Sequence, residues 1–134
     1  MEGVIDTSVL VDYILLEAPN HELAKTSLER IDRGFLPTVV VEELVSVLAK
    51  VGLDKKTINE KLRETLETYD VLSVNTSGIS EAASHVMAER DIGFKRFNDK
   101  LILTLAKTEG LPLLTLDKEL MKECKANGVK LLSE

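Results

Sequence analysis

The stretch G-V-I-D-T-S-V-L-V-D-Y, residues 3–13, decides the fold of this chain. Val4 and Ile5 form a short apolar run of the kind that makes a buried strand. Asp6 ends this run, two hydroxyl residues follow it, and apolar residues then resume, which is typical of a helix start. The stretch therefore predicts a strand, a sharp turn and a helix, with a carboxylate at the turn. In open α/β sheets such a turn lies at the carboxyl end of a strand, where ligands bind.

Asp6 can be interpreted in two ways. It can be a helix N-cap without any chemistry, because aspartate is a favoured residue type at that position. It can also be a metal-binding or catalytic carboxylate. A decision between the two requires other acids that the fold brings to the same point.

Length and composition indicate a single domain over residues 1–134. Hydrophobic residues make up 44% of the chain and charged residues 30%, as in ordinary globular proteins. The sequence has no apolar run of about 18 residues and begins without the basic and apolar segments of a signal peptide, so we expect a cytoplasmic protein without a membrane span. Cys124 is the single cysteine, which excludes an internal disulfide and a cysteine-based zinc site.

The net charge is −6, from 17 basic and 23 acidic residues. This balance argues against a protein that holds nucleic acid on a broad basic face. With two Tyr, three Phe and no Trp, a platform for stacking bases is also disfavoured. A nucleic-acid enzyme stays possible, because bound divalent cations would offset clustered acids and bridge them to phosphate.

Apolar runs and helical periodicities alternate along the chain. Short strands are predicted at 4–5, 35–36, 71–74, 113–114 and 129–132, although the β-branched residues 39–41 could extend the second strand. Helices are predicted at 9–16, 21–31, 38–50, 54–66, 76–90, 98–109 and 117–125, with Arg33-Gly34 closing the second and Gly110 ending the sixth. This alternation predicts an α/β fold with three layers, α/β/α, around a short parallel sheet of about four or five strands.

Four acids are predicted to meet at one edge of this sheet. Asp6 and Asp117 leave two parallel strands, whose carboxyl ends point the same way. Asp99 starts the helix that leads into the last of these strands, and Glu43 lies in the first turns of the helix after the second strand. Both positions place them near the same edge.

Clustered carboxylates raise one another's pKa and require compensation. Mg²⁺ or Mn²⁺ would supply it, because both ions prefer oxygen ligands. The chemistry that fits is phosphodiester hydrolysis. Taken singly, Asp99 and Asp117 could instead be helix caps, and Glu43, like its neighbour Glu42, a solvated helix residue.

Three cations, Lys95, Arg96 and Lys100, flank Asp99. They can belong to a solvated turn, or they can contact a phosphate near the acids. The sequence leaves these alternatives open.

Three blocks together resemble the PIN domain family, most closely its VapC-type toxin ribonucleases and their archaeal relatives. They are I-D-T-S-V-L-V-D-Y at the N-terminus, V-V-V-E-E-L-V-S-V-L around residue 43, and N-D-K-L-I-L-T-L-A-K-T-E-G-L-P-L-L-T-L-D-K-E-L at 98–120. The last block is the most specific, because an acid, a helix ending in G-L-P, a strand and T-x-D follow at the spacing of the family.

The resemblance implies a Mg²⁺- or Mn²⁺-dependent endoribonuclease. Its metal-binding and catalytic acids correspond to Asp6, Glu43, Asp99 and Asp117, with Thr7 and Thr115 in supporting positions. Glu43 fits the second acid better than Glu42, because the family has an aliphatic residue after it. The resemblance also implies an RNA substrate, a small antitoxin that covers the site and a homodimer.

Two other classes of function stay open at this point. A catalytically inactive PIN-like scaffold or RNA-processing binding module would keep the fold without the chemistry. A receiver-type or phosphatase-type domain would use an aspartate nucleophile, but Asp6 lacks the second nearby aspartate that such chemistry usually requires.

Overall fold

The fold is built on a four-stranded parallel sheet in the order β3-β2-β1-β4. The structure is a computed structural model that describes residues 1–90 and 92–132. Short β-branched and leucine-rich runs form the strands, which are β1 (Glu2–Ile5), β2 (Arg33–Pro37), β3 (Asp70–Leu72) and β4 (Leu113–Leu114). β1 and β2 are the central strands, so the stretch around Asp6 begins in the middle of the molecule.

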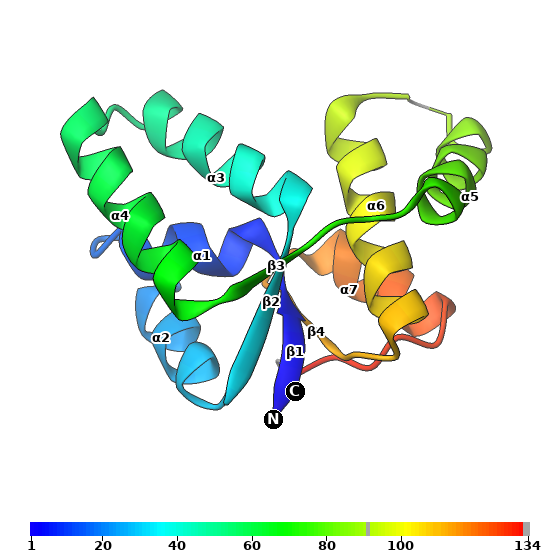
Figure 1. Cartoon of the computed structure of the whole chain (residues 1–134), viewed down its shortest axis with the longest axis horizontal. Helices are drawn as coiled ribbons and strands as arrows, with labels where there is room; N and C mark the ends of the chain where they lie inside the picture. The colour runs from blue at the N-terminus through cyan, green and yellow to red at the C-terminus, as the bar shows by residue number, and fades with distance from the viewer. Residues whose placement is uncertain (91, 133–134) are drawn as a thin grey trace.

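Helices cover both faces of the sheet. Figure 1 shows α1 to α4 on one side of the strands and α5 to α7 on the other. This arrangement confirms the predicted three-layer α/β/α class. The helices are α1 (Thr7–Ile14), α2 (His21–Glu29), α3 (Thr38–Lys50), α4 (Lys55–Thr68), α5 (Thr76–Met87), α6 (Phe94–Glu109) and α7 (Lys118–Ala126).

Strand register brings the two predicted acid-bearing turns together. Ile5 is paired with Leu114, and the backbone N–H of Asp6 donates to the Leu114 carbonyl at 2.9 Å. The residues that follow these pairs, Asp6 and Thr115, therefore leave the sheet side by side at its carboxyl edge. Figure 1 shows α3 rising away from this edge, with the start of α6 facing it across the edge while the rest of α6 runs down beside the sheet.

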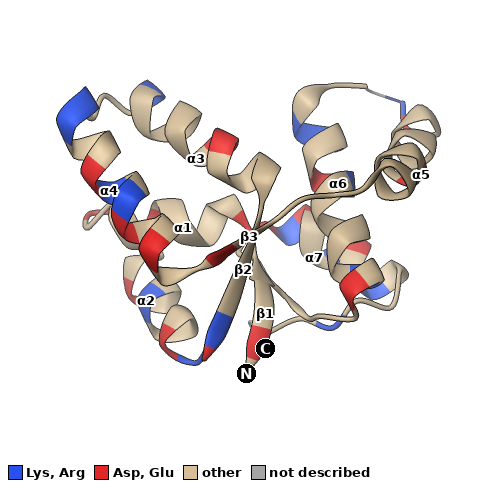
Figure 2. Cartoon of the chain, viewed as in Figure 1, with Lys and Arg blue, Asp and Glu red and all other residues tan. Residues whose placement is uncertain are grey.

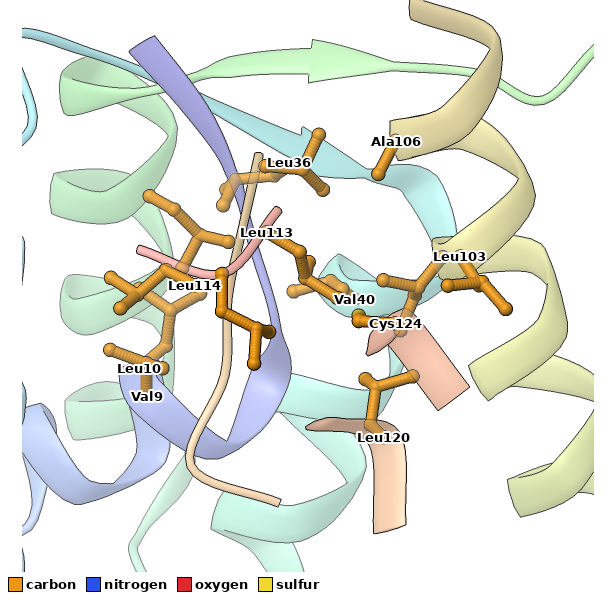
Figure 3. Close-up of a cluster of buried hydrophobic side chains, with 14 of the residues drawn as sticks. Val9, Leu10, Leu36, Val40, Leu103, Ala106, Leu113, Leu114, Leu120 and Cys124 are labelled. Atoms are coloured by element: carbon orange, nitrogen blue, oxygen red, sulfur yellow. The ribbon is translucent and has the colours of Figure 1, made fainter. Parts of the chain in front are cut away.

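Apolar side chains from every layer meet around the sheet. Figure 3 shows side chains of α1, β2, α3, β4, α6 and α7 converging on one cluster, which includes Leu36, Leu103 and Cys124. α6 is the most deeply placed helix, since its residues 99–106 are all buried. The helix that carries Asp99 is therefore part of the core, and the acid is held by rigid packing.

Several predicted boundaries are wrong. Arg33 and Gly34 begin β2 and do not close the preceding helix, which ends at Glu29. The reason is steric: a Cβ on Gly34 would lie 2.6 Å from both Ile5 Cδ1 and Tyr69 Cδ1, so this glycine permits close packing inside the sheet. The predicted helix 38–50 is confirmed as α3, so residues 39–41 do not extend the second strand, whereas the fifth helix ends at Met87 and not at residue 90.

The strands that the second half of the chain contributes to the sheet are shorter than predicted. The third strand spans Asp70–Leu72, and in place of a strand at 129–132 there is one isolated bridge between Leu113 and Leu131. Gly110 does end α6, with φ of +66°, a left-handed conformation that favours glycine. The segment 91–97 between the fifth and sixth predicted helices, expected to be a turn, lies partly outside the described residues, and α6 already begins at Phe94.

Among the described residues, no helix is both long enough and apolar enough to cross a membrane.

We predict that Leu36→Ala lowers the free energy of unfolding by about 2–5 kcal/mol, because it leaves a cavity in the fully buried centre of β2. Urea denaturation at neutral pH measures this loss. Leu16→Ala is the matched control: Leu16 is 77% exposed, so its truncation should change stability by about 0.5 kcal/mol or less. Equal losses in both variants would contradict the described core.

Candidate active site

Asp6 occupies the N-cap position of α1, but its side chain makes no capping hydrogen bond. Its Oδ2 instead accepts from the hydroxyls of Ser8 and Thr115, each at 2.8 Å. The residue is only 3% exposed. Helix capping therefore does not explain why an acid stands here, and the carboxylate is held in place by hydroxyl groups from two different strand ends.

Thr115 connects Asp6 to Asp117. Its fully buried hydroxyl donates to Asp6 Oδ2 and accepts from the backbone N–H of Asp117 at 3.0 Å. Asp117 is a true N-cap, since its Oδ1 accepts from the N–H groups of Glu119 and Leu120 at 2.9 and 3.4 Å. Its other oxygen, Oδ2, is directed to the site. Asp117 therefore both caps α7 and belongs to the clustered acids.

Glu43 reaches the same edge from α3. Thr7 Oγ1 donates to Glu43 Oε1 at 2.9 Å, which fixes the carboxylate beside the residue that follows Asp6. Glu43 is partly buried, whereas Glu42 is exposed. Of the two adjacent glutamates, Glu43 is thus the one that the fold places beside Asp6.

Asp99 lies within α6, one turn beyond its start, and is 2% exposed. It is not a helix cap, because α6 begins at Phe94 and not at residue 98 as predicted. Burial raises the pKa of Asp99 to about 6, the charge of Lys95 opposes this rise, and the charges of Asp6 and Asp117 add to it. Because the charges of Asp6 and Asp117 both act on the pKa of Asp99, the three carboxylates lie in one electrostatic environment.

Lys95 bridges two of the acids. Its Nζ donates to Asp99 Oδ1 at 3.1 Å and to Asp117 Oδ2 at 2.8 Å. Burial lowers the pKa of Lys95, but its bond to Asp117 and the charge of Asp99 more than offset this and raise it above its ordinary value. Burial acts to raise the pKa of Asp117, but the hydrogen bond and the charge of Lys95 lower this pKa below its ordinary range.

A hollow of about 250 Å³ opens beside Asp6, Glu43 and Lys95. Its lining also includes Asp12 of α1, an acid that the sequence did not predict as a site residue. Ser8 and Asp12 are one helical turn apart and therefore lie on the same face of α1. The helical period after Asp6 could have identified both as residues of the site. The lining residues are Asp6, Thr7, Ser8, Val11, Asp12, Glu43, Val47 and Lys95.

The other two flanking cations do not face the acids. Arg96 contacts Glu89, Glu119 and Glu123 at 2.8–3.2 Å, and Lys100 contacts Glu89 and Glu123 at 2.9 and 2.7 Å. This charged network joins α6 to α7 and to the residues after α5. Lys100 is 8% exposed, so the cluster is neither a solvated turn nor, apart from Lys95, a phosphate-facing patch.

The donor set suits a hard divalent cation. Within the residues that the structure describes, no three acidic, histidine or cysteine side chains lie close enough together to hold a metal ion as they stand. Asp6 and Glu43 nevertheless line one hollow, and the Lys95 ammonium group beside it already bridges Asp99 and Asp117. The site thus attracts positive charge through oxygen atoms alone, which is the ligand chemistry of Mg²⁺ and Mn²⁺.

Charge at this edge is local and mixed. Figure 2 shows acidic and basic stretches interspersed over the helices, with an acidic stretch on α3 and a basic one at the start of α6. No broad basic face is visible in this view.

We predict that Asp99 makes stability fall as pH rises from 3.8 to about 6 in EDTA. Over this window the folded state retains a proton that the unfolded chain releases, so rising pH favours unfolding. Urea denaturation across pH should show that the free energy of unfolding of Asp99→Asn rises relative to that of the unsubstituted protein up to about pH 6. Above this pH the difference should stay constant, on the order of 2 kcal/mol. Parallel stability profiles of the two proteins would contradict this.

Comparison with known proteins agrees with the fold and the sequence blocks. The family model described as "PIN domain" matches residues 3–125. Among solved structures, the Mycobacterium tuberculosis toxin VapC20, described as cleaving the sarcin-ricin loop, superposes with a TM-score of 0.78 at 13% identity, covering 92% of this chain and 95% of that one. No curated protein matches the sequence.

Two further solved structures are similar in fold. VapBC-1 from nontypeable Haemophilus influenzae has a TM-score of 0.70 at 17% identity, with 100% of both chains covered. FitAcB from Neisseria gonorrhoeae has a TM-score of 0.68 at 20% identity, covering 98% of this chain and 96% of that one. At these identities the superpositions show a shared fold. The family match covers most of the chain, and with this fold and these acids in place the chain belongs to the PIN domain family.

Proposed function

We propose that this chain is a divalent-metal-dependent endoribonuclease and the toxin of a toxin–antitoxin pair. The observation that carries the proposal is that Asp6 and Glu43 line one hollow at the carboxyl edge of the sheet, and that Lys95, which also lines it, is ion-paired with Asp99 and Asp117. Family membership supports the nuclease class. The similar VapC and FitAB structures support the narrower toxin assignment.

The four carboxylates would hold one or two Mg²⁺ or Mn²⁺ ions. When bound, such an ion lowers the pKa of water and stabilises the leaving oxygen in an in-line displacement at phosphorus. The residues of the chain do the rest: Thr115 and Ser8 fix the Asp6 carboxylate, and Thr7 fixes that of Glu43. Because these hydroxyls are themselves packed, the carboxylates are oriented before any ligand binds.

Access for a polymer substrate is provided by a second, larger groove next to the hollow. It has a volume of about 940 Å³, runs between α3 and α6, and shares Glu43 and Lys95 with the hollow. A scissile phosphate can therefore reach the acids while the rest of a chain extends along the groove. This openness suits an RNA strand better than a small phosphate ester.

An antitoxin partner forms part of the proposal. Its support is that similar structures are described as VapBC or FitAB assemblies, one of them bound to a DNA fragment. A short reading frame next to the gene for this chain, encoding a DNA-binding N-terminal segment, should specify this partner. Its product should abolish RNA cleavage when mixed with the chain in equimolar amounts.

We predict that the chain cleaves labelled RNA with Mn²⁺ or Mg²⁺, that EDTA stops the cleavage and that added Mn²⁺ restores it. Asp6→Asn should reduce the cleavage rate by about 100-fold or more, because it removes a negative ligand at the centre of the site. Gel analysis of end-labelled RNA fragments measures both effects.

Asp54→Asn is the matched control for this experiment. Asp54 caps α4 through the N–H of Thr57, and asparagine caps helices equally well, so this variant should keep full activity. Cleavage that persists in EDTA, or in Asp6→Asn purified by the same procedure, would contradict the nuclease proposal. A chain that binds neither Mn²⁺ nor RNA would instead be a scaffold on the PIN fold.

A further inference from the structure

Lys95 occupies an unusual position for a surface lysine. It lies in the first turn of α6, and its ammonium group is shared between Asp99 at 3.1 Å and Asp117 at 2.8 Å. Its side chain is nevertheless 61% exposed, and it also lines the hollow beside Asp6 and Glu43. The positive charge thus sits among the acids, while the stem that carries it remains free to move.

The oxygens that Lys95 holds are the ones that a divalent ion needs. Asp99 and Asp117 are two of the four proposed ligands, and each uses one oxygen for the ammonium group. Two cations on the same carboxylate oxygens repel each other strongly at this range. A metal ion coordinated by both acids and the Lys95 ammonium group in its observed position therefore compete for these two carboxylates.

The neighbouring cations show that this arrangement is specific to Lys95. Arg96 and Lys100 each have carboxylate partners of their own, Glu89 and Glu123, and Lys100 is buried. These pairs keep both groups away from the hollow. Lys95 alone of the three is paired with proposed metal ligands and is exposed enough to leave them.

We propose that Lys95 is a displaceable internal cation that neutralises the acids in the metal-free protein, and that metal binding releases its ammonium group to contact the phosphate of the substrate. The inference rests on the proposed nuclease function. The released group would remain tethered at the mouth of the groove that leads to the acids, since Lys95 lines both the hollow and the groove. A lysine ammonium on a flexible stem is well suited to this exchange, because it binds phosphate as a point charge.

Two consequences of opposite sign distinguish this role from that of a structural ion pair. Removal of the ammonium group should strengthen metal binding, because the metal no longer competes for Asp99 and Asp117. The same removal should weaken substrate binding, because the phosphate loses a contact. A structural pair, in contrast, would leave both acids misplaced and weaken the two together.

Calorimetric titration with Mn²⁺ tests the first consequence. We expect Lys95→Met to lower the Kd for Mn²⁺ by about tenfold, since one charge-assisted contact no longer opposes the ion. Lys50→Met and Lys107→Met are the controls. Lys50 lines the same groove without a hydrogen bond or ion pair to the four acids in the described part of the chain, and Lys107 lies near the far end of α6. Both should change the Kd by about twofold or less.

Steady-state cleavage of labelled RNA at saturating Mn²⁺ tests the second consequence. Lys95→Met should raise KM by about tenfold, while Lys95→Arg, which retains the charge, should restore most of the loss. If Lys95→Met does not fold, as judged by circular dichroism, Lys95→Gln takes its place. An unchanged KM would overturn the phosphate contact.

The failure of this inference is distinguishable from failure of the nuclease proposal. If the unsubstituted chain and Lys95→Met bind Mn²⁺ equally well, or if Lys95→Met binds it more weakly, Lys95 is not a displaceable cation, although the metal site stands. If neither binds Mn²⁺, the metal-dependent function itself is wrong.

Discussion

The structure depends on how buried negative charge is stabilised at the carboxyl edge of the sheet. Asp6 and Asp99 are 3% and 2% exposed, and burial of an ionised carboxylate is costly unless hydrogen bonds or an opposite charge compensate for it. Asp6 receives two hydroxyl groups, whereas Asp99 receives the Lys95 ammonium. The raised pKa of Asp99 shows that its compensation is incomplete. We therefore expect a further positive charge to be favourable at this site.

Backbone topology provides part of the compensation. Asp6 and Asp117 stand at the N-cap positions of α1 and α7, where the positive end of a helix dipole stabilises negative charge. Both positions follow directly from parallel strands, because a helix after each strand begins at the same edge of the sheet. Thr115 then connects the two acids through one hydroxyl. The fold thus creates an anionic site from local rules of helix capping and strand register.

The sequence predicted the class of the fold because its signals there are local. Alternating strand and helix patterns, the capping residue Asp54 and the terminating Gly110 all act over a few residues. Errors arose where tertiary packing decides the outcome. Gly34 resembles a helix C-cap in sequence, but it lies in β2, paired with Gly3, where a side chain would clash with Ile5 and Tyr69.

The placement of the acids was predictable from topology, but their chemical state was not. Parallel register requires Asp6 and Asp117 to meet, and α6, which precedes β4, brings Asp99 to the same edge. Which cation pairs with which acid depends on side-chain directions, and these emerge only in three dimensions. Lys95, Arg96 and Lys100 look equivalent in sequence, yet i,i+4 geometry directs Lys95 to Asp99 while the other two turn to α7.

This division of the cations also explains how α6 can serve two roles. The helix must be rigid, because it is part of the core and positions Asp99, and its network with Glu89 and Glu123 secures its first turns. Lys100 and Glu123 are largely buried, so breaking this network would leave a buried charge without its partner, which is costly in free energy. Lys95 is exposed, so its own ammonium group can move into solvent at little desolvation cost, and in the proposal a metal ion takes its place beside Asp99. A helix whose inner charges are fixed and whose outermost charge is exchangeable can therefore hold the acids in place while it lets their counter-ion change.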